Sequence, residues 1–211
     1  GYETSGNRYP VFYLLHGAGD SDDSWSTVGR ANFIVDNLIA SGDAEPMIVV
    51  MPDGHQPVRG GGGMQIAEFA VEFAADIKPY VEDHYRVRTG RENTAIAGLS
   101  MGGMHTLEVA IADLDQYAYV GVYSSGVFGI TDSDDWVTTN ADALNDPALK
   151  DGLEHFWFAI GDEDFLLDTA TATVAALREH DFDIAYHESG GGHTWMNWRD
   201  YLEEFAQVVF R

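Results

Sequence analysis

Residues 94–103 read TAIAGLSMGG, an apolar stretch that leads into small residues on both sides of Ser100. The apolar residues predict a buried strand, and the sequence from Met101 to Ala112 has a helical period. A serine between strand and helix lies on a sharp turn that exposes its hydroxyl, and the helix N-terminus favours developing negative charge. We therefore interpret Ser100 as a nucleophile, with a structural tight turn as the alternative.

Short apolar stretches alternate with longer helical ones along the 211 residues. The apolar stretches predict strands at Val11–Leu15, Met47–Met51, Thr94–Leu99, Tyr119–Tyr123, Phe156–Ile160 and Ile184–His187. The stretches between them predict helices at Ala31–Ala40, Ile66–Tyr85, Met101–Ala112, Thr169–His180 and Trp195–Phe210. Apolar strands separated by helices are typical of an α/β protein with a mostly parallel sheet covered on both faces. The length suits a single domain, residues 1–211.

A histidine follows the last expected strand. In parallel sheets, active residues gather in the loops after the carboxyl ends of the strands. His193 lies in such a loop, directly after three glycines, and no apolar period assigns it to the core. Imidazole can remove and return a proton near neutral pH. We interpret His193 as the general base, with a loop histidine of no catalytic role as the alternative.

An acid must orient this histidine, and the chain order serine, acid, histidine is expected on this architecture. Spacing alone leaves four candidates after the fifth expected strand, namely Asp162, Glu163, Asp164 and Asp168. Asp168 is better interpreted as the N-cap of a helix that begins at Thr169. The other three remain open at this point.

The glycine-rich sequence after the first expected strand reads HGAG, residues 16–19. A backbone N–H near Gly17 and the N–H of Met101 would together stabilise an oxyanion. A simple glycine turn is the alternative. His16 itself is interpreted as a structural hydrogen-bonding residue.

Three stretches together resemble the esterase D / feruloyl esterase family of α/β-hydrolases: residues 9–17 (YPVFYLLHG), 95–103 (AIAGLSMGG) and 191–195 (GGHTW). The similarity covers nearly the whole chain and includes residues 73–85. In this family the acid is the last carboxylate of a Gly-x-x-Asp turn. The resemblance, and not the spacing, therefore selects Asp164 in the turn that begins at Gly161.

The resemblance implies a serine carboxylesterase that hydrolyses feruloyl or other hydroxycinnamoyl esters of plant cell-wall polysaccharides, or related small esters, through an acyl-enzyme without a cofactor. An acetyl-xylan or general short-chain esterase and an acyltransferase with the same triad are alternatives, and a non-catalytic binding protein on this fold is a third. An extracellular location is expected for such an enzyme, although no signal peptide is recognisable in these residues. A cytoplasmic location is the alternative.

Aromatic residues near the expected site could contact an aryl acyl group. Trp25, in the loop after Gly17, and Trp195, two residues after His193, have the best positions, whereas Trp198 is expected in the core. The long polar segment 125–151 would shape the acyl pocket or form an ordinary surface excursion.

The chain carries 11 lysines and arginines against 35 aspartates and glutamates, a formal net charge of -24. A polyanion would approach against this field, so we expect no nucleic acid partner and no membrane partner. The absence of cysteine excludes disulfides and thiolate metal sites. An acidic, lysine-poor surface also indicates adaptation to high salt, with ordinary solubility as the alternative.

Two acidic stretches, Asp20–Asp23 and Asp132–Asp135, resemble ligands for a hard cation. Neither has the glutamate that a calcium loop needs at its twelfth position, so we expect solvated loops and no metal. The run Gly60–Gly63 lacks the following lysine and serine or threonine of a phosphate-binding loop.

The first expected strand is preceded by only ten residues, whereas members of the resembled family have further strands there. The N-terminal strands are therefore expected to be reduced or missing, which leaves Met47–Met51 as an apolar edge strand. An open apolar edge favours aggregation unless it is covered. We expect cover by a second copy of the chain or by residues 1–8, or that the chain is a fragment of a longer enzyme.

Overall fold

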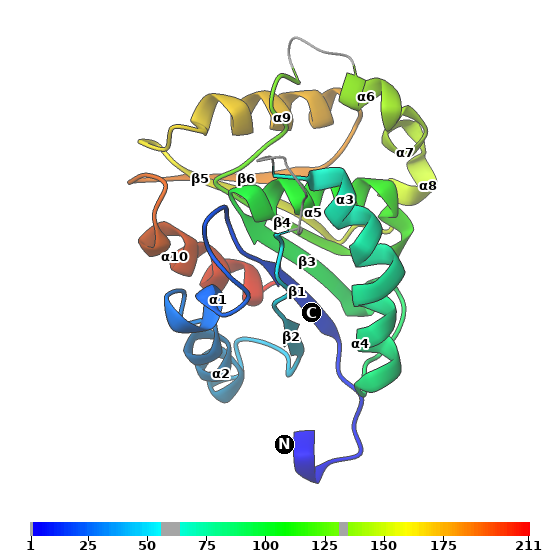
Figure 1. Ribbon diagram of the computed structural model, residues 1–211, viewed down its shortest axis with the longest axis vertical. Helices are drawn as coiled ribbons and strands as arrows, with labels where there is room; N and C mark the ends of the chain where they lie inside the picture. The colour runs from blue at the N-terminus through cyan, green and yellow to red at the C-terminus, as the bar shows by residue number, and fades with distance from the viewer. Residues whose placement is uncertain (1, 56–63, 131–134) are drawn as a thin grey trace.

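The computed structural model describes residues 2–55, 64–130 and 135–211. Its centre is a six-stranded sheet with the strand order β2-β1-β3-β4-β5-β6 (Figure 1). The strands are β1 (Val11–Leu15), β2 (Ile48–Val50), β3 (Thr94–Leu99), β4 (Tyr119–Tyr123), β5 (His155–Gly161) and β6 (Ile184–Ser189). All five pairings between these strands are parallel, which confirms the predicted α/β class.

Helices cover both faces of the sheet (Figure 1). They are α1 (Ser24–Thr27), α2 (Ala31–Ser41), α3 (Ile66–Glu72), α4 (Lys78–His84), α5 (Met101–Ala112), α6 (Asp135–Thr139), α7 (Ala141–Asn145), α8 (Pro147–Lys150), α9 (Leu167–Glu179) and α10 (Trp195–Ala206). Shorter helical segments are η1 (Tyr2–Thr4), η2 (Phe73–Ile77, a π-helical turn), η3 (Arg91–Asn93) and η4 (Leu114–Gln116).

Successive side chains of β1 to β5 enter two different hydrophobic cores, because strand side chains alternate between the two faces. On one face, Tyr13 of β1 packs edge-on against Phe73, with ring centroids 4.9 Å apart, beside α3, α5 and α9. On the other face, Phe12 packs against Phe205 of α10 at 5.8 Å. The sheet therefore lies between two buried hydrophobic layers. A functional site is accordingly expected in the loops that connect the strands to the helices.

The predicted strand bounds agree with the structure for β1, β3 and β4 and differ by one or two residues elsewhere. The helix predicted at Ile66–Tyr85 is divided into α3, η2 and α4. The π-helical turn precedes Pro79, which has no N–H to donate to the helix. The last helix ends at Ala206 rather than Phe210, and segment 125–151 contains α6, α7 and α8.

The prediction that Asp168 caps a helix beginning at Thr169 is wrong, since α9 begins at Leu167. Asp168 lies in the first turn, where a carboxylate still interacts favourably with the helix dipole. The N-cap position belongs to Leu166, whose N–H donates to Oδ1 of Asp164 at 2.9 Å. The carboxylate that accepts a backbone N–H at this helix start is therefore that of Asp164.

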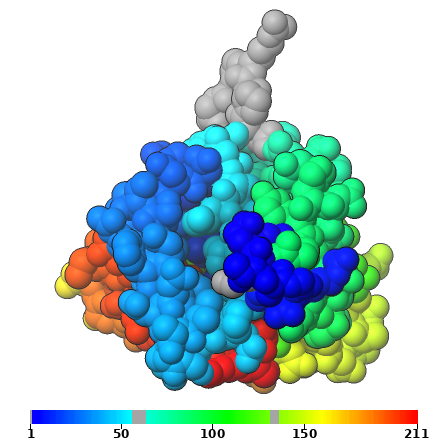
Figure 2. All heavy atoms as spheres, turned by 90° about the horizontal axis from the view of Figure 1, so that it is seen from below, coloured from blue at the N-terminus to red at the C-terminus, as the bar shows by residue number. Residues whose placement is uncertain are grey.

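Strand β2 lies at one edge of the sheet, as the sequence predicted. Within the described residues it pairs only with β1, and residues 2–8 add no strand to its open side. The N-terminal segment instead borders a hollow of about 680 Å³ beside β2, lined by Tyr2, Met47 and Tyr85 among others (Figure 2). Residues 2–8 therefore do not pair with the edge strand β2. Pairing of β2 with a second copy of the chain stays a prediction.

The run Gly60–Gly63 and the residues Asp132–Asp134 lie outside the described residues, so the predictions made for them stay predictions. Across the part of the chain that the structure describes, no helix has the length and apolar character needed to cross a bilayer.

Candidate active site

Ser100 occupies the turn between β3 and α5 in a conformation that non-glycine residues rarely adopt, with φ 52° and ψ −117°. Its N–H donates to the carbonyl of Tyr123 at 2.9 Å, and its carbonyl accepts from the hydroxyl of Ser125 at 2.6 Å. A Cβ on Gly98 would lie 2.2 Å from the carbonyl oxygen of Gly102. The small residues around Ser100 are therefore required for the backbone to turn so sharply.

His193 and Asp164 are in contact across two loops. Nδ1 of His193 lies 2.9 Å from Oδ2 and 3.1 Å from Oδ1 of Asp164, so the ring N–H donates to the carboxylate. Burial of this carboxyl raises its pKa, but hydrogen bonds from His193, the Leu166 N–H and Ser124 outweigh that effect and lower it overall. Asp164 is therefore ionised at neutral pH, and Nε2 of His193 is left as the basic nitrogen.

The loops that carry these two residues are fastened together by their backbones. The N–H of Glu163 donates to the carbonyl of Gly191 at 2.8 Å, and the N–H of Gly191 donates to Oδ1 of Asp162 at 3.0 Å. A Cβ on Gly161 would lie 2.1 Å from the carbonyl oxygen of Gly191. Of the four acids left open by spacing, Asp164 contacts His193, and Asp162 holds the histidine loop.

Gly17 lies beside Ser100, as the oxyanion-hole prediction requires. A Cβ on Gly17 would stand 3.3 Å from Cβ of Ser100 and 2.6 Å from Cδ1 of Leu99. Met101 is the first residue of α5, so its N–H is one of the groups that have no partner within the helix. The structure therefore brings both Gly17 and Met101 next to Ser100.

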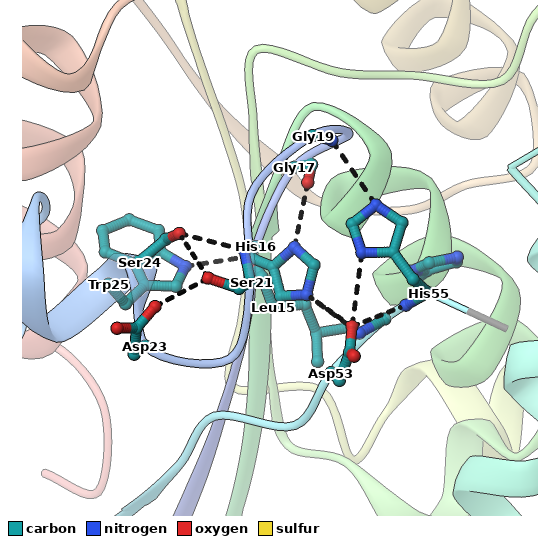
Figure 3. A network of polar contacts seen from close by, with 12 residues as sticks. Leu15, His16, Gly17, Gly19, Ser21, Asp23, Ser24, Trp25, Asp53 and His55 are labelled. Carbon is teal, nitrogen blue, oxygen red and sulfur yellow. Dashed lines mark hydrogen bonds and ion pairs between the residues drawn. The ribbon is translucent and has the colours of Figure 1, made fainter. Parts of the chain in front are cut away.

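A cluster of polar side chains links the Gly17 loop to the loop after β2 (Figure 3). The Nδ1–H of His16 donates to the carbonyl of Gly17 at 2.9 Å, and its Nε2 accepts from the N–H of Gly54 at 2.9 Å. His55 accepts from the N–H of Gly19 at 3.4 Å, and its own N–H donates to Oδ1 of Asp53 at 2.9 Å. The prediction of His16 as a structural residue agrees with these contacts.

Metal-type donor atoms of His16, Asp53 and His55 lie within 4.8 Å of one another. Two imidazoles and a carboxylate would suit zinc or a similar transition metal. The lone pair of His16 Nε2 is already used by the N–H of Gly54, however. Burial raises the pKa of Asp53, but hydrogen bonds from the backbone N–H and the ring of His55 outweigh it and lower the pKa overall. We therefore interpret the cluster as a hydrogen-bonded clamp on the Gly17 loop.

The two tryptophans predicted to contact substrate are placed differently. Trp25 is 1% exposed, and its indole N–H donates to the carbonyl of Leu15 at 3.0 Å. Its ring meets that of Trp195 edge-on at 5.1 Å. Trp195 is half-buried and keeps accessible surface. The expectation of direct substrate contact is therefore corrected for Trp25, whose buried ring packs edge-on against Trp195.

Three further residues that the sequence patterns did not single out for the site contact His193 or Asp164, with Ser124 hydrogen-bonded to the Asp164 carboxylate. Trp198, predicted as a core residue, is buried, meets the His193 ring edge-on at 5.0 Å and donates its N–H to Oγ of Ser124 at 2.9 Å. On another side, the ring of Phe165 lies 4.5 Å from that of His193. Ser124 follows β4 at the carboxyl end, which is the one sequence signal that could have indicated it.

The fold and this site together define an α/β-hydrolase. The serine follows β3 on a strained turn, the acid follows β5 and the histidine follows β6, all at the carboxyl ends of parallel strands.

The family model Esterase, described as "Putative esterase", matches residues 1–207. The chain belongs to this esterase family. It is 30% identical over 208 residues to the endo-1,4-beta-xylanase/feruloyl esterase of Xylanibacter ruminicola, covering 97% of this chain and 27% of that protein. The chain thus spans about a quarter of the length of this curated relative.

Solved structures are similar over the whole fold. A ferulic acid esterase matches with a TM-score of 0.83 and 28% identity, over 100% of this chain and 88% of that one. A feruloyl esterase module from Clostridium thermocellum complexed with sinapinate also has a TM-score of 0.83, with 25% identity over 97% of this chain and 78% of that one.

Proposed function

We propose that this chain is a serine carboxylesterase that hydrolyses hydroxycinnamoyl esters of plant cell-wall polysaccharides. The observation that carries the proposal is the hydrogen bond between His193 and Asp164 at the same end of the sheet as the strained turn of Ser100. The similarity to esterases of ferulic acid supports the assignment of a hydroxycinnamoyl group as the acyl half of the substrate.

The reaction proceeds in two acyl-transfer steps. Ser100 Oγ attacks the ester carbonyl while Nε2 of His193 takes its proton, and Asp164 holds the ring and stabilises its positive charge. The N–H groups of Gly17 and Met101 receive the oxyanion. His193 then gives the proton to the leaving alcohol, and a water activated by the same nitrogen releases the hydroxycinnamic acid.

Two features of the structure support an aryl acyl group. Trp195 offers a half-buried aromatic surface close to His193. A cavity of about 380 Å³ beside α5 is lined by Met104, Phe128 and Trp136, and its volume lies within the range of small-molecule pockets. Segment 125–151 supplies one wall of this cavity, in keeping with a role in shaping the acyl pocket.

Hydrolysis of methyl ferulate compared with a nitrophenyl acetate tests the acyl preference. A much higher kcat/KM on methyl ferulate is expected, whereas equal values would favour the general or acetyl esterase. Product analysis with an added alcohol or sugar acceptor separates hydrolysis from acyl transfer. Labelling of Ser100 by a fluorophosphonate probe is expected, and its failure would favour a binding protein on this fold.

We propose further that residues 1–211 act as a single catalytic domain outside the cell, without a cofactor and without nucleic acid or membrane partners. The curated relative is a xylanase linked to a feruloyl esterase, and such polymers lie outside the cell. The net charge of -24 suits a neutral ester substrate and helps to expel a carboxylate product. Detection of the protein in a culture medium tests the location.

A further inference from the structure

Phe165 is an aromatic side chain in an unusual position. It is 76% exposed, although both of its chain neighbours, Asp164 and Leu166, are buried. Its ring centroid lies 4.5 Å from that of His193, with an angle of 48° between the planes. Burying the apolar surface of a phenylalanine side chain is favourable, because that surface is removed from water. A molecule that covers this ring would therefore gain binding energy directly beside the general base.

The backbone on both sides of Phe165 is held in place. The N–H of Asp164 donates to the carbonyl of Gly161 at 3.1 Å, and the N–H of Leu166 donates to the Asp164 carboxylate at 2.9 Å. The preceding residue, Glu163, is tied to Gly191 in the histidine loop. Little backbone freedom is left to lose on binding, so a ligand on this ring pays a small ordering cost.

The chemistry of His193 indicates which half of the ester lies here. His193 must return its proton to the oxygen of the leaving alcohol, so that oxygen lies within hydrogen-bond reach of its ring. The carbonyl oxygen, by contrast, is directed to Gly17 and Met101. A ring packed against His193 is therefore adjacent to the alcohol half of the substrate. Trp198 is buried against the same histidine and offers little surface of its own.

We propose that Phe165 is the platform on which the leaving saccharide rests, with the C–H face of one sugar ring against the aromatic ring. This inference rests on the proposed function, because it assigns the alcohol half of that ester. A sugar face presents apolar C–H groups and hydroxyls at its edge, so it matches an exposed aromatic ring. The exposed carboxylate of Glu163, two residues before Phe165, can accept hydrogen bonds from those hydroxyls.

The test compares two esters of the same acid. Methyl ferulate has no sugar, whereas a feruloylated pentose oligosaccharide carries one. For Phe165→Ala we expect about tenfold lower kcat/KM on the oligosaccharide, chiefly through a higher KM. Activity on methyl ferulate should stay within about twofold of wild type, because only the sugar contact is lost. Phe165→Trp should restore the oligosaccharide activity, and Phe33→Ala, at a phenylalanine of α2 that is 59% exposed, is the matched control.

Equal losses on both esters would overturn the proposal, because Phe165 would then act by positioning His193. No loss on either ester would overturn it as well. A second readout does not depend on hydrolysis: NMR saturation transfer from the protein to the unesterified oligosaccharide. We expect signal on the sugar C–H protons with wild type and Phe165→Trp, and its loss with Phe165→Ala. If wild type cleaves neither ferulate ester, the proposed function fails, while this NMR comparison still supports or overturns the platform.

Discussion

Nδ1 of His193 lies 2.9 Å from Oδ2 of Asp164, although the two residues are 29 positions apart in the sequence. The ring N–H is committed to the carboxylate, so the tautomer is fixed with its basic nitrogen at Nε2. The backbone hydrogen bond from Glu163 to Gly191 holds the two loops at this separation. The orientation of the His193 ring, our proposed general base, therefore depends on both loops and not on His193 alone.

Replacing Asp164 with asparagine should remove this control of the tautomer. An amide N–H facing Nδ1 would favour a proton on Nε2, so we expect kcat to fall by about 10⁴. Asp162→Asn is the matched control, because an amide oxygen can still accept from the N–H of Gly191. Steady-state kinetics on methyl ferulate measure both. Comparable kcat values for the two variants would remove Asp164 from the proposed mechanism.

Ser100→Ala should lower kcat by about 10⁴ to 10⁶, since the covalent intermediate can no longer form. The folded state should be retained, because a smaller side chain fits the same turn. Labelling by a fluorophosphonate probe should disappear at the same time. Ser41→Ala, at an exposed serine that ends α2, should keep full activity and labelling. Activity of Ser100→Ala within tenfold of wild type would refute the nucleophile assignment.

Gly98→Ala tests the close approach at the turn. The new Cβ would lie 2.2 Å from the carbonyl oxygen of Gly102 and 2.9 Å from Cβ of Leu15, and neither atom can move away without a shift of its own backbone. We expect a loss of stability of at least about 3 kcal/mol, or failure to fold. A Cβ on Gly6 has nothing within 4 Å, so Gly6→Ala is the control. The midpoint of urea unfolding measures the difference, and equal midpoints would contradict the packing described for the turn.

His105 should make stability depend on pH. The pKa of His105 is lowered to about 4, chiefly because the ring is buried. A hydrogen bond to the Met64 carbonyl raises this pKa, and the nearby His16 and His55 lower it. Between pH 4 and its ordinary pKa near 6.5, the unfolded chain therefore binds more protons than the folded one. The contribution of His105 to the free energy of unfolding is therefore fully present above about pH 6.5 and decreases as the pH falls towards 4.

His105→Gln removes this titration and keeps a side-chain donor for the Met64 carbonyl. We expect its free energy of unfolding to vary less than that of wild type between pH 6.5 and 5, by roughly 1–2 kcal/mol. His84→Gln, at an exposed histidine, should leave the wild-type slope unchanged. Urea unfolding at several pH values provides the comparison. Parallel curves for wild type and His105→Gln would show that His105 is not the group that titrates.

Local patterns predicted the parts of the site that depend on local geometry. The turn around Ser100 follows from an apolar strand, small residues and a helical period within ten positions, and the structure places it there. Asp164 could not be separated from Asp162 and Glu163 by spacing, because its contact with His193 depends on how two distant loops meet. Only the family resemblance selected it.

The exposure of single aromatic side chains, by contrast, could not be predicted from local patterns. Trp25 and Trp195 have similar positions relative to site motifs, yet one is buried beneath the other. Phe165 follows the acid directly and was not singled out, because a single aromatic residue in a turn has no periodicity that indicates exposure. Burial of an isolated side chain depends on tertiary packing. The hydrophobic periods of two residues in strands and 3.6 residues in helices carry no information about it.

The net charge of -24 should make stability depend on salt. Like charges repel one another in the compact state, and raising the ionic strength from 0.1 to 1 M shortens the screening length from about 10 to about 3 Å. We expect the melting temperature to rise by several degrees over this range. Replacing the exposed Asp22, Asp43 and Glu203 with their amides should raise the low-salt value and reduce the dependence on salt. Sucrose stabilises without screening charge, so as a control it should raise the melting temperatures of wild type and of the amide variant equally. Fold and activity unchanged at low salt, with a flat melting temperature, would contradict the interpretation of the acidic surface as an adaptation to high salt.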